Sequence, residues 1–118
     1  MHIKKDARLL RIFLGDSDKI GMTPVYEKIV IEAKKTGLAG ATVFKGIMGF
    51  GRSSRIHTSK ILRLSADLPL IIEIVDENEK IEEFVPHLDQ IFEEADCGGL
   101  ITIEKADVIK YTTNKGKG

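Results

Sequence analysis

The amino-acid sequence predicts an α+β fold in which two helices cover one face of a four-stranded antiparallel sheet. Three observations predict it: four apolar runs have the length and composition of strands, two longer segments have apolar residues at helical spacing, and the six follow the order β-α-β-β-α-β. The length of 118 residues predicts a single domain over 1–118. Its ends, 1–5 and 112–118, are expected to fray.

The first strand and the first helix are predicted from the beginning of the chain. Residues 7–14 form the strand, and both of its faces are largely apolar. The helix is predicted to begin with Thr23 as its N-cap and Pro24 at the first helical position. Gly37 is predicted to end it in a left-handed C-cap.

Two further strands are predicted in the middle of the chain. The second strand covers residues 41–45. Residues 61–64 and 70–75 are interpreted as one bent or bulged third strand, because Pro69 is tolerated only at an edge or a bulge.

The last helix and the last strand complete the order. Asp76 or Asn78 is predicted to cap the helix, which keeps its apolar phase through Pro86, so we expect a kink there rather than a stop. The last strand is predicted over residues 100–103 and 106–111.

This order of elements is the ferredoxin-like, split β-α-β pattern. Two helices on one face leave the other face of the sheet open. The first and third strands are apolar on both sides, and a bare surface of that kind exceeds what monomers normally expose. We therefore expect copies of the chain to cover one another's open faces.

Composition and charge narrow the classes of function. Eighteen Lys and Arg balance eighteen Asp and Glu, which argues against a general nucleic-acid binder. No apolar run approaches the roughly 20 residues that cross a bilayer, so no membrane insertion is expected. The basic N-terminus lacks a signal-like core and Cys97 is the only cysteine, so we expect a cytoplasmic protein without internal disulfides.

The connection over residues 46–59 is the most informative segment. A hairpin needs about two to five residues, and longer loops on compact scaffolds usually carry function. Glycines let backbone N–H groups approach an anion, and arginines and hydroxyls add donors for phosphate or carboxylate. We therefore interpret it as an anion or nucleotide site. Its candidate ligand-binding residues are Gly49, Gly51, Arg52, Ser53, Ser54, Arg55 and His57.

Two motif matches in this loop are incomplete. The Gly-x-x-x-x-Gly-Arg-Ser spacing at residues 46–53 approaches the phosphate-binding P-loop, but Arg replaces the required Lys and the residues after it are strand-like. The Gly-Phe-Gly motif at 49–51 matches part of an RNA-recognition signature, but Phe50 is expected to anchor the loop on the core. An RNA-binding module and a small enzyme with an intersubunit site around His57 remain as alternatives.

The other polar residues show no catalytic or metal-ligating pattern. Asp16 and Asp18 are interpreted as residues of a solvated turn in preference to a functional pair of loop carboxylates. The histidines and Cys97 are scattered without ligand spacing, so no metal site is predicted. No set of nucleophile, base and orienting residue is recognisable, so we expect no catalytic residues and no enzyme activity.

Four stretches of the sequence together resemble one known family. They are Leu10–Phe13, Gly37–Val43, the Gly-Phe-Gly motif with Ser53–His57, and Leu68–Pro69 with Ile72–Val75. On these residues the chain resembles the PII signalling superfamily, and within it an uncharacterised bacterial and archaeal branch of PII-like proteins. The resemblance extends over residues 9–111.

The resemblance implies a ferredoxin-like homotrimer whose 46–59 loop is a mobile effector loop that meets a protein partner. By motif position, Gly51 and Arg52 would contact an adenine nucleotide in a cleft between subunits. Residues 96–99 lack the lysine of the second phosphate-binding loop of PII proteins, and 112–115 lack their C-terminal arginine. These departures favour a small anion or a different nucleotide, and they leave the ligand, the partner and the pathway open.

Overall fold

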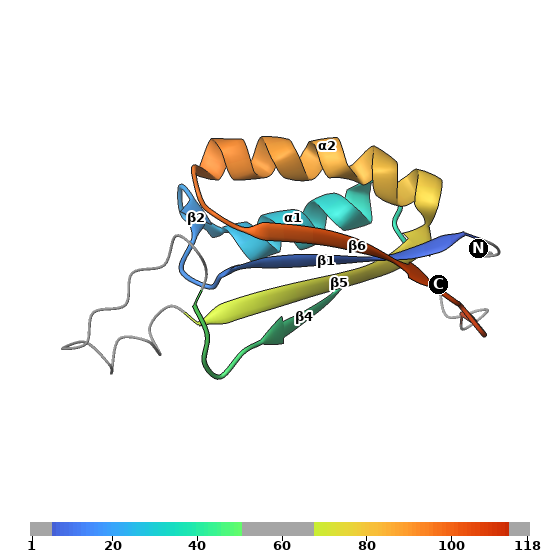
Figure 1. Ribbon diagram of the computed structural model, residues 1–118. Coiled ribbons are helices and arrows are strands. Elements are labelled where there is room, and N and C mark those ends of the chain that lie inside the picture. The colour runs from blue at the N-terminus through green and yellow to red at the C-terminus, as the bar shows by residue number, and fades with distance from the viewer. Residues whose placement is uncertain (1–5, 51–67, 114–118) are drawn as a thin grey trace.

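The computed structural model describes residues 6–50 and 68–113. Its elements are β1 (Ala7–Gly15), β2 (Lys19–Ile20), β3 (Thr23–Pro24), α1 (Val25–Lys35), β4 (Thr42–Lys45), β5 (Pro69–Glu77), α2 (Asn78–Ala95) and β6 (Leu100–Ala106). The main sheet is antiparallel with the order β4-β5-β1-β6, and β2 pairs with β3 in a separate hairpin. Both helices lie on one side of the main sheet (Figure 1). The predicted α+β ferredoxin-like fold is therefore confirmed.

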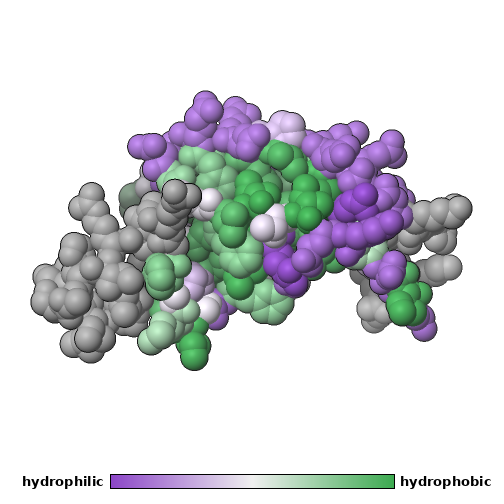
Figure 2. Space-filling model, in the orientation of Figure 1, coloured by the Kyte–Doolittle hydropathy of each residue, from purple (hydrophilic) through white to green (hydrophobic). Residues whose placement is uncertain are grey.

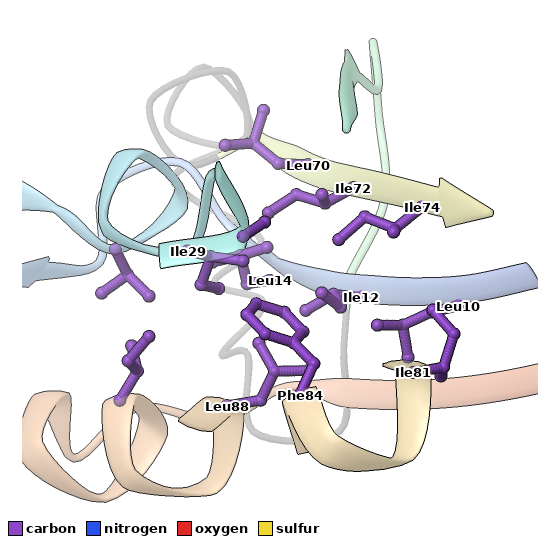
Figure 3. Close-up of a cluster of buried hydrophobic side chains, with 13 residues drawn as sticks. Leu10, Ile12, Leu14, Ile29, Leu70, Ile72, Ile74, Ile81, Phe84 and Leu88 are labelled. Atoms are coloured by element: carbon purple, nitrogen blue, oxygen red, sulfur yellow. The ribbon is translucent and has the colours of Figure 1, made fainter. Parts of the chain in front are cut away.

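The hydrophobic core fills the space between the sheet and the helices (Figure 3). Alternate residues of a strand point to the same side, so each central strand contributes every second residue to the core. The helices contribute residues at a spacing of three or four. The buried cluster consists of Leu10, Ile12, Leu14, Val25, Ile29, Ala33, Leu70, Ile72, Ile74, Ile81, Phe84, Leu88 and Ile91. Burial of each large side chain contributes about 1.5–3 kcal/mol to folding.

The start of α1 differs from the prediction. Pro24 is the N-cap and Val25 is the first helical residue, so the helix begins one residue later than expected. Thr23 does not cap the helix because it is paired with Ile20 in the short hairpin. The Val25 amide has no acceptor within the helix and donates instead to the carbonyl of Asp18 at 2.9 Å.

The end of α1 agrees with the prediction. Gly37 has φ +84°, the left-handed conformation that favours glycine. The Gly37 amide donates to the Lys34 carbonyl at 3.2 Å, and the Leu38 amide donates to the Ala33 carbonyl at 3.1 Å. These two bonds are the Schellman motif, which satisfies the last carbonyl groups of the helix.

The start of α2 also differs from the prediction. Glu77 occupies the N-cap position without a side-chain cap bond, and Asn78 is already helical. The carboxylate of Asp76 is 1% exposed and accepts hydrogen bonds from the amides of Ala39 at 2.9 Å and Glu77 at 2.7 Å. Asp76 therefore fastens the segment between α1 and β4 to the start of α2. The helix continues through Pro86, so the expectation that Pro86 does not stop it is confirmed.

The last strand is shorter than predicted. β6 ends at Ala106, which is paired with Ala7, the first residue of β1. Residues 107–113 are not a strand, because the ladder has no further partner residues in β1. Within this segment the Tyr111 hydroxyl donates to the Ala39 carbonyl at 3.4 Å.

The prediction of a bent third strand is tested only in its second part. β5 begins at Pro69, which is a first-strand position where proline is tolerated. Residues 61–64, the first part of that prediction, lie outside the described residues. Among the residues that the structure describes, no helix is long and apolar enough to cross a membrane.

Candidate functional site

The two ends of the connection between β4 and β5 lie side by side at one end of the sheet. The Gly46 amide donates to the Pro69 carbonyl, with an N···O distance of 2.7 Å. This bond follows directly on the antiparallel pair of Lys45 with Leu70. This junction, the loop neck, consists of Asp16, Lys45, Gly46, Gly49, Leu68 and Pro69.

Two glycines of the loop neck lie where the chain passes closely over Pro69. A Cβ atom at Gly46 would lie 2.7 Å from Cγ of Pro69 and 3.3 Å from its carbonyl oxygen. A Cβ atom at Gly49 would lie 3.0 Å from the same Cγ atom. The Pro69 ring can yield only by a change of pucker, so a larger residue at Gly46 would displace this part of the chain, whereas one at Gly49 needs a shift of a few tenths of an ångström.

Asp16 connects both ends of the connection to the end of β1. Its amide donates to the Leu68 carbonyl at 2.9 Å, and its Oδ1 accepts from the Leu68 amide at 3.1 Å. Its Oδ2 lies 3.2 Å from Nζ of Lys45. The Asp16 side chain is 19% exposed, whereas that of Lys45 is 58% exposed.

The turn after β1 holds Asp16 in place. Oδ2 of Asp18 accepts from the Gly15 amide at 3.2 Å, and the Asp18 carbonyl accepts from the first residue of α1. Side-chain acceptors of this kind make aspartate a favoured turn residue. The prediction of a solvated turn is therefore wrong for Asp16, whose carboxylate is mostly buried and bonded at both oxygens.

Large apolar side chains lie exposed where the chain leaves β4. Ile47 is 94% exposed, Met48 73% and Phe50 73%, while Phe44 at the sheet edge is 48% exposed. Figure 2 shows hydrophobic residues beside the grey atoms at the lower left, where Figure 1 places the chain after β4. The expectation that Phe50 anchors the loop on the core is wrong, because this ring faces solvent.

Only part of the predicted ligand site can be placed. Gly49 lies in the loop neck, against Pro69. The other six candidates, Gly51, Arg52, Ser53, Ser54, Arg55 and His57, lie outside the described residues. The contacts of Asp16 and Lys45 in the loop neck were not predicted from the sequence. The available signal was an aspartate in the turn after a central strand together with a lysine that directly precedes the glycine-rich connection.

The face of the sheet opposite the helices carries an apolar row. The antiparallel register aligns Leu100, Phe13, Ile71 and Phe44 across β6, β1, β5 and β4. Leu100 is 56% exposed and Phe13 and Ile71 are partly exposed. The expected apolar open face is therefore present in the described part of the chain.

A charged cluster lies beside this row on the same face. Nε of Arg11 donates to Oε2 of Glu73 at 2.8 Å, and its Nη1 donates to Oε1 of Glu104 at 3.0 Å. The hydrogen bond with Glu73 is the main reason that the pKa of the Arg11 guanidinium is raised above its ordinary value. The cluster holds two carboxylates to one guanidinium, so it is acidic overall.

The environment of Cys97 raises the pKa of its thiol. Burial raises the pKa of its thiol to about 11, and the carboxylates of Asp18 and Asp96 add to the increase. A thiol of this kind is a poor nucleophile at neutral pH. Within residues 6–50 and 68–113, no group of three or more His, Cys, Asp and Glu side chains is arranged to hold a metal ion.

The sequence and the fold place the chain in a known family. A sequence model of DUF190, described as "Uncharacterized ACR, COG1993", matches residues 7–108, and the chain belongs to this family. A UPF0166 protein of Aquifex aeolicus (strain VF5) is 38% identical over 102 residues, which cover 86% of this chain and 92% of the relative. A UPF0166 protein of Methanocaldococcus jannaschii is 38% identical over 107 residues, which cover 91% and 95%.

The fold is also that of a solved PII-like protein. CPII from Thiomonas intermedia K12, a nitrogen regulatory PII-like protein whose structure contains ADP, AMP and bicarbonate, matches with a TM-score of 0.64. The match covers 88% of this chain and 89% of CPII at 16% sequence identity. At that identity the match shows the fold, and the resemblance to the PII-like group is confirmed at that level.

Proposed function

We propose that this member of the DUF190 family is a non-catalytic, PII-like regulator. In this proposal a small anion or an adenine nucleotide binds between subunits, and the 46–59 loop passes the bound state to a protein partner. The loop neck is the observation that carries the proposal, because it fixes both ends of a glycine-, serine- and arginine-rich connection to the sheet. A fixed base lets a ligand act on a long loop without disturbing the core.

The ligand class follows from the donors in and beside the loop neck. Gly49 lies at the loop neck, and the proposed ligand-binding residues that follow it are Gly51, Arg52, Ser53, Ser54, Arg55 and His57. Arginine forks and backbone amides recognise phosphate and carboxylate groups. CPII, which shares the fold, holds ADP, AMP and bicarbonate, so these three are the first ligands to test here.

The proposal includes a homotrimer formed through the open face of the sheet. The row of Leu100, Phe13, Ile71 and Phe44 is wider than the isolated apolar residues that occur on monomer surfaces. A closed ring of copies covers such a row on each subunit, because one surface patch repeats around the axis. The ligand cleft then lies where the loop neck of one copy meets its neighbour.

Titration calorimetry with ADP, AMP and bicarbonate, singly and in pairs, tests the ligand claim. The wild type is expected to bind at least one of them, and Arg52→Ala is expected to bind it about tenfold more weakly, which corresponds to about 1.4 kcal/mol. Lys28→Ala is the control, because it removes one exposed positive charge from α1. Absence of binding by the wild type, or equal binding by Arg52→Ala, would overturn the ligand claim.

A further inference from the structure

We propose that Lys45 is an anion-binding residue of the loop neck and that Asp16 is its internal competitor. An anion that binds Lys45 breaks the ion pair between Lys45 and Oδ2 of Asp16. The hydrogen bond from the Leu68 amide to Oδ1 of Asp16 then changes as well. This inference rests on the proposed function, because it assigns to two described residues the step that couples the ligand to the loop.

Lys45 is accessible to a ligand although it is already paired. Its Nζ lies 3.2 Å from Oδ2 of Asp16, but more than half of its side chain is exposed. An ion pair with an exposed partner changes an equilibrium constant by a factor of about five at most. A phosphate or carboxylate ligand that makes a second contact in the loop neck can therefore replace Asp16 at this ammonium group.

Asp16 can transmit that replacement to the far end of the connection, because its carboxylate contacts both ends. Its two oxygens serve opposite ends, with Oδ2 at Lys45 before the connection and Oδ1 at the Leu68 amide after it. The two oxygens of a carboxylate are fixed relative to each other. A rotation of the Asp16 carboxylate that breaks its ion pair with Lys45 therefore also moves Oδ1 relative to the Leu68 amide. The bond from the Asp16 amide to the Leu68 carbonyl does not involve the carboxylate and remains. The expected change is therefore confined to one hydrogen bond and leaves the sheet intact.

The first experiment measures binding of ADP, AMP and bicarbonate by Lys45→Met. Affinity for the probe that the wild type binds is expected to fall about tenfold, because a charge-assisted contact is lost. Lys105→Met is the matched control, since Lys105 is an exposed strand lysine paired in register with Arg8 at the opposite end of the sheet. Its affinity is expected to equal that of the wild type. Lys45→Gln provides a second, polar variant with the same expectation.

The second experiment removes the competitor. Asp16→Asn keeps an oxygen that accepts from the Leu68 amide but removes the charge at Lys45, so the same probe is expected to bind about two- to fivefold more tightly. Hydrogen exchange of the Leu68 amide gives a separate readout. In the wild type its protection is expected to change on addition of the probe, and in Asp16→Asn and Lys45→Met it is expected to stay constant.

The outcomes separate this inference from the proposed function. If the wild type binds none of the probes, both are overturned. If the wild type binds but Lys45→Met binds equally well, or Asp16→Asn binds more weakly, the competitor mechanism is overturned while the ligand-binding regulator stands. If the affinities change as expected but Leu68 protection in the wild type is independent of the probe, Lys45 is a ligand residue and the coupling through Asp16 is overturned.

Discussion

Ile71 and Ile72 are neighbours in β5 with the same side chain, but they lie on opposite faces of the sheet. Ile72 is 0% exposed beneath the two helices, whereas Ile71 is partly exposed in the apolar row of the open face. The chain places apolar residues on both faces of the sheet but covers only one face with its own helices (Figure 1). A face that is apolar but uncovered within the protomer is suited to another protein surface.

The polar groups on the two faces differ in the same way. Asp76, on the covered face, is buried and satisfied by two backbone amides of its own chain. Arg11, on the open face, is partly exposed and pairs with two carboxylates that are themselves partly exposed or exposed. The buried carboxylate on the covered face therefore has its hydrogen-bond partners within one chain. The charged groups on the open face remain accessible to a second molecule.

The largest expected effect distinguishes the two isoleucines directly. Ile72→Ala is expected to lower the free energy of unfolding by about 2–5 kcal/mol, because it leaves a cavity in the core. Ile71→Ala is expected to cost about 1 kcal/mol or less in the protomer, since less of its surface is removed from water. Urea unfolding at low protein concentration measures both. Equal losses would contradict the difference between the faces.

Asp76 provides the next largest effect. Asp76→Ala leaves the amides of Ala39 and Glu77 without their acceptor, and a buried donor without a partner costs about 1–3 kcal/mol. Asp89→Ala removes an exposed carboxylate from α2 and is expected to change stability by less than about 0.5 kcal/mol. Urea unfolding of the pair tests the assignment. A neutral result for Asp76→Ala would show that solvent replaces the carboxylate.

A charge in the apolar row is expected to alter association more than folding. In the proposed trimer, Ile71→Asp places a carboxylate where the open faces of neighbouring copies meet, and an unpaired charge buried in an interface is strongly unfavourable. Sedimentation is expected to show a trimer for the wild type and a monomer for this variant. Ile31→Asp is the control, because Ile31 is 49% exposed on α1, and it is expected to leave the trimer intact. A monomeric wild type would remove the open face from the proposal.

The smallest effect concerns the rim of the covered face, where Cys97 packs against the core. Burial raises the pKa of the Cys97 thiol to about 11, so the reactive thiolate is scarce at neutral pH and increases as pH rises toward that value. The rate of alkylation by iodoacetamide, followed by mass spectrometry, is expected to reach half its maximum near pH 11 in the folded protein. In urea the midpoint is expected near 9, the ordinary value. Coincident midpoints would show that the rim is open to water.

Most of the fold was predictable because its signals are local. Short runs that are apolar on both faces predicted β1 and β5, helical spacing predicted both helices, and glycine in a left-handed position ended α1 at the expected place. The errors arose where tertiary contacts override local signals. Thr23 pairs with Ile20 in a short hairpin and does not cap α1. Asp76 accepts a hydrogen bond from Ala39, which is far away in sequence, and does not cap α2. The extent of β6 depends on where β1 begins, which its own residues do not encode.

The sequence predicted the position of the candidate site but not the side-chain contacts that form it. Glycines and arginines identified the 46–59 connection, and Gly49 lies against Pro69 at its base. Asp16 and Lys45 are far apart in sequence, and only the pairing of β1 with β5 and of β5 with β4 brings them to 3.2 Å. Side-chain pairs that depend on strand order cannot be read from single segments.

The side-by-side ends at Gly46 and Pro69 also bear on how freely the connection can vary in length. When both ends of a loop are already fixed together, lengthening it costs little, since each doubling of its length adds only about 0.6 kcal/mol of closure entropy. The core and the ladder between β4 and β5 are made by residues on either side of the connection. The scaffold is therefore suited to display foreign peptides: a recognition sequence inserted after Gly49 would be presented from a stationary base, as a cassette that can be exchanged without redesign of the fold.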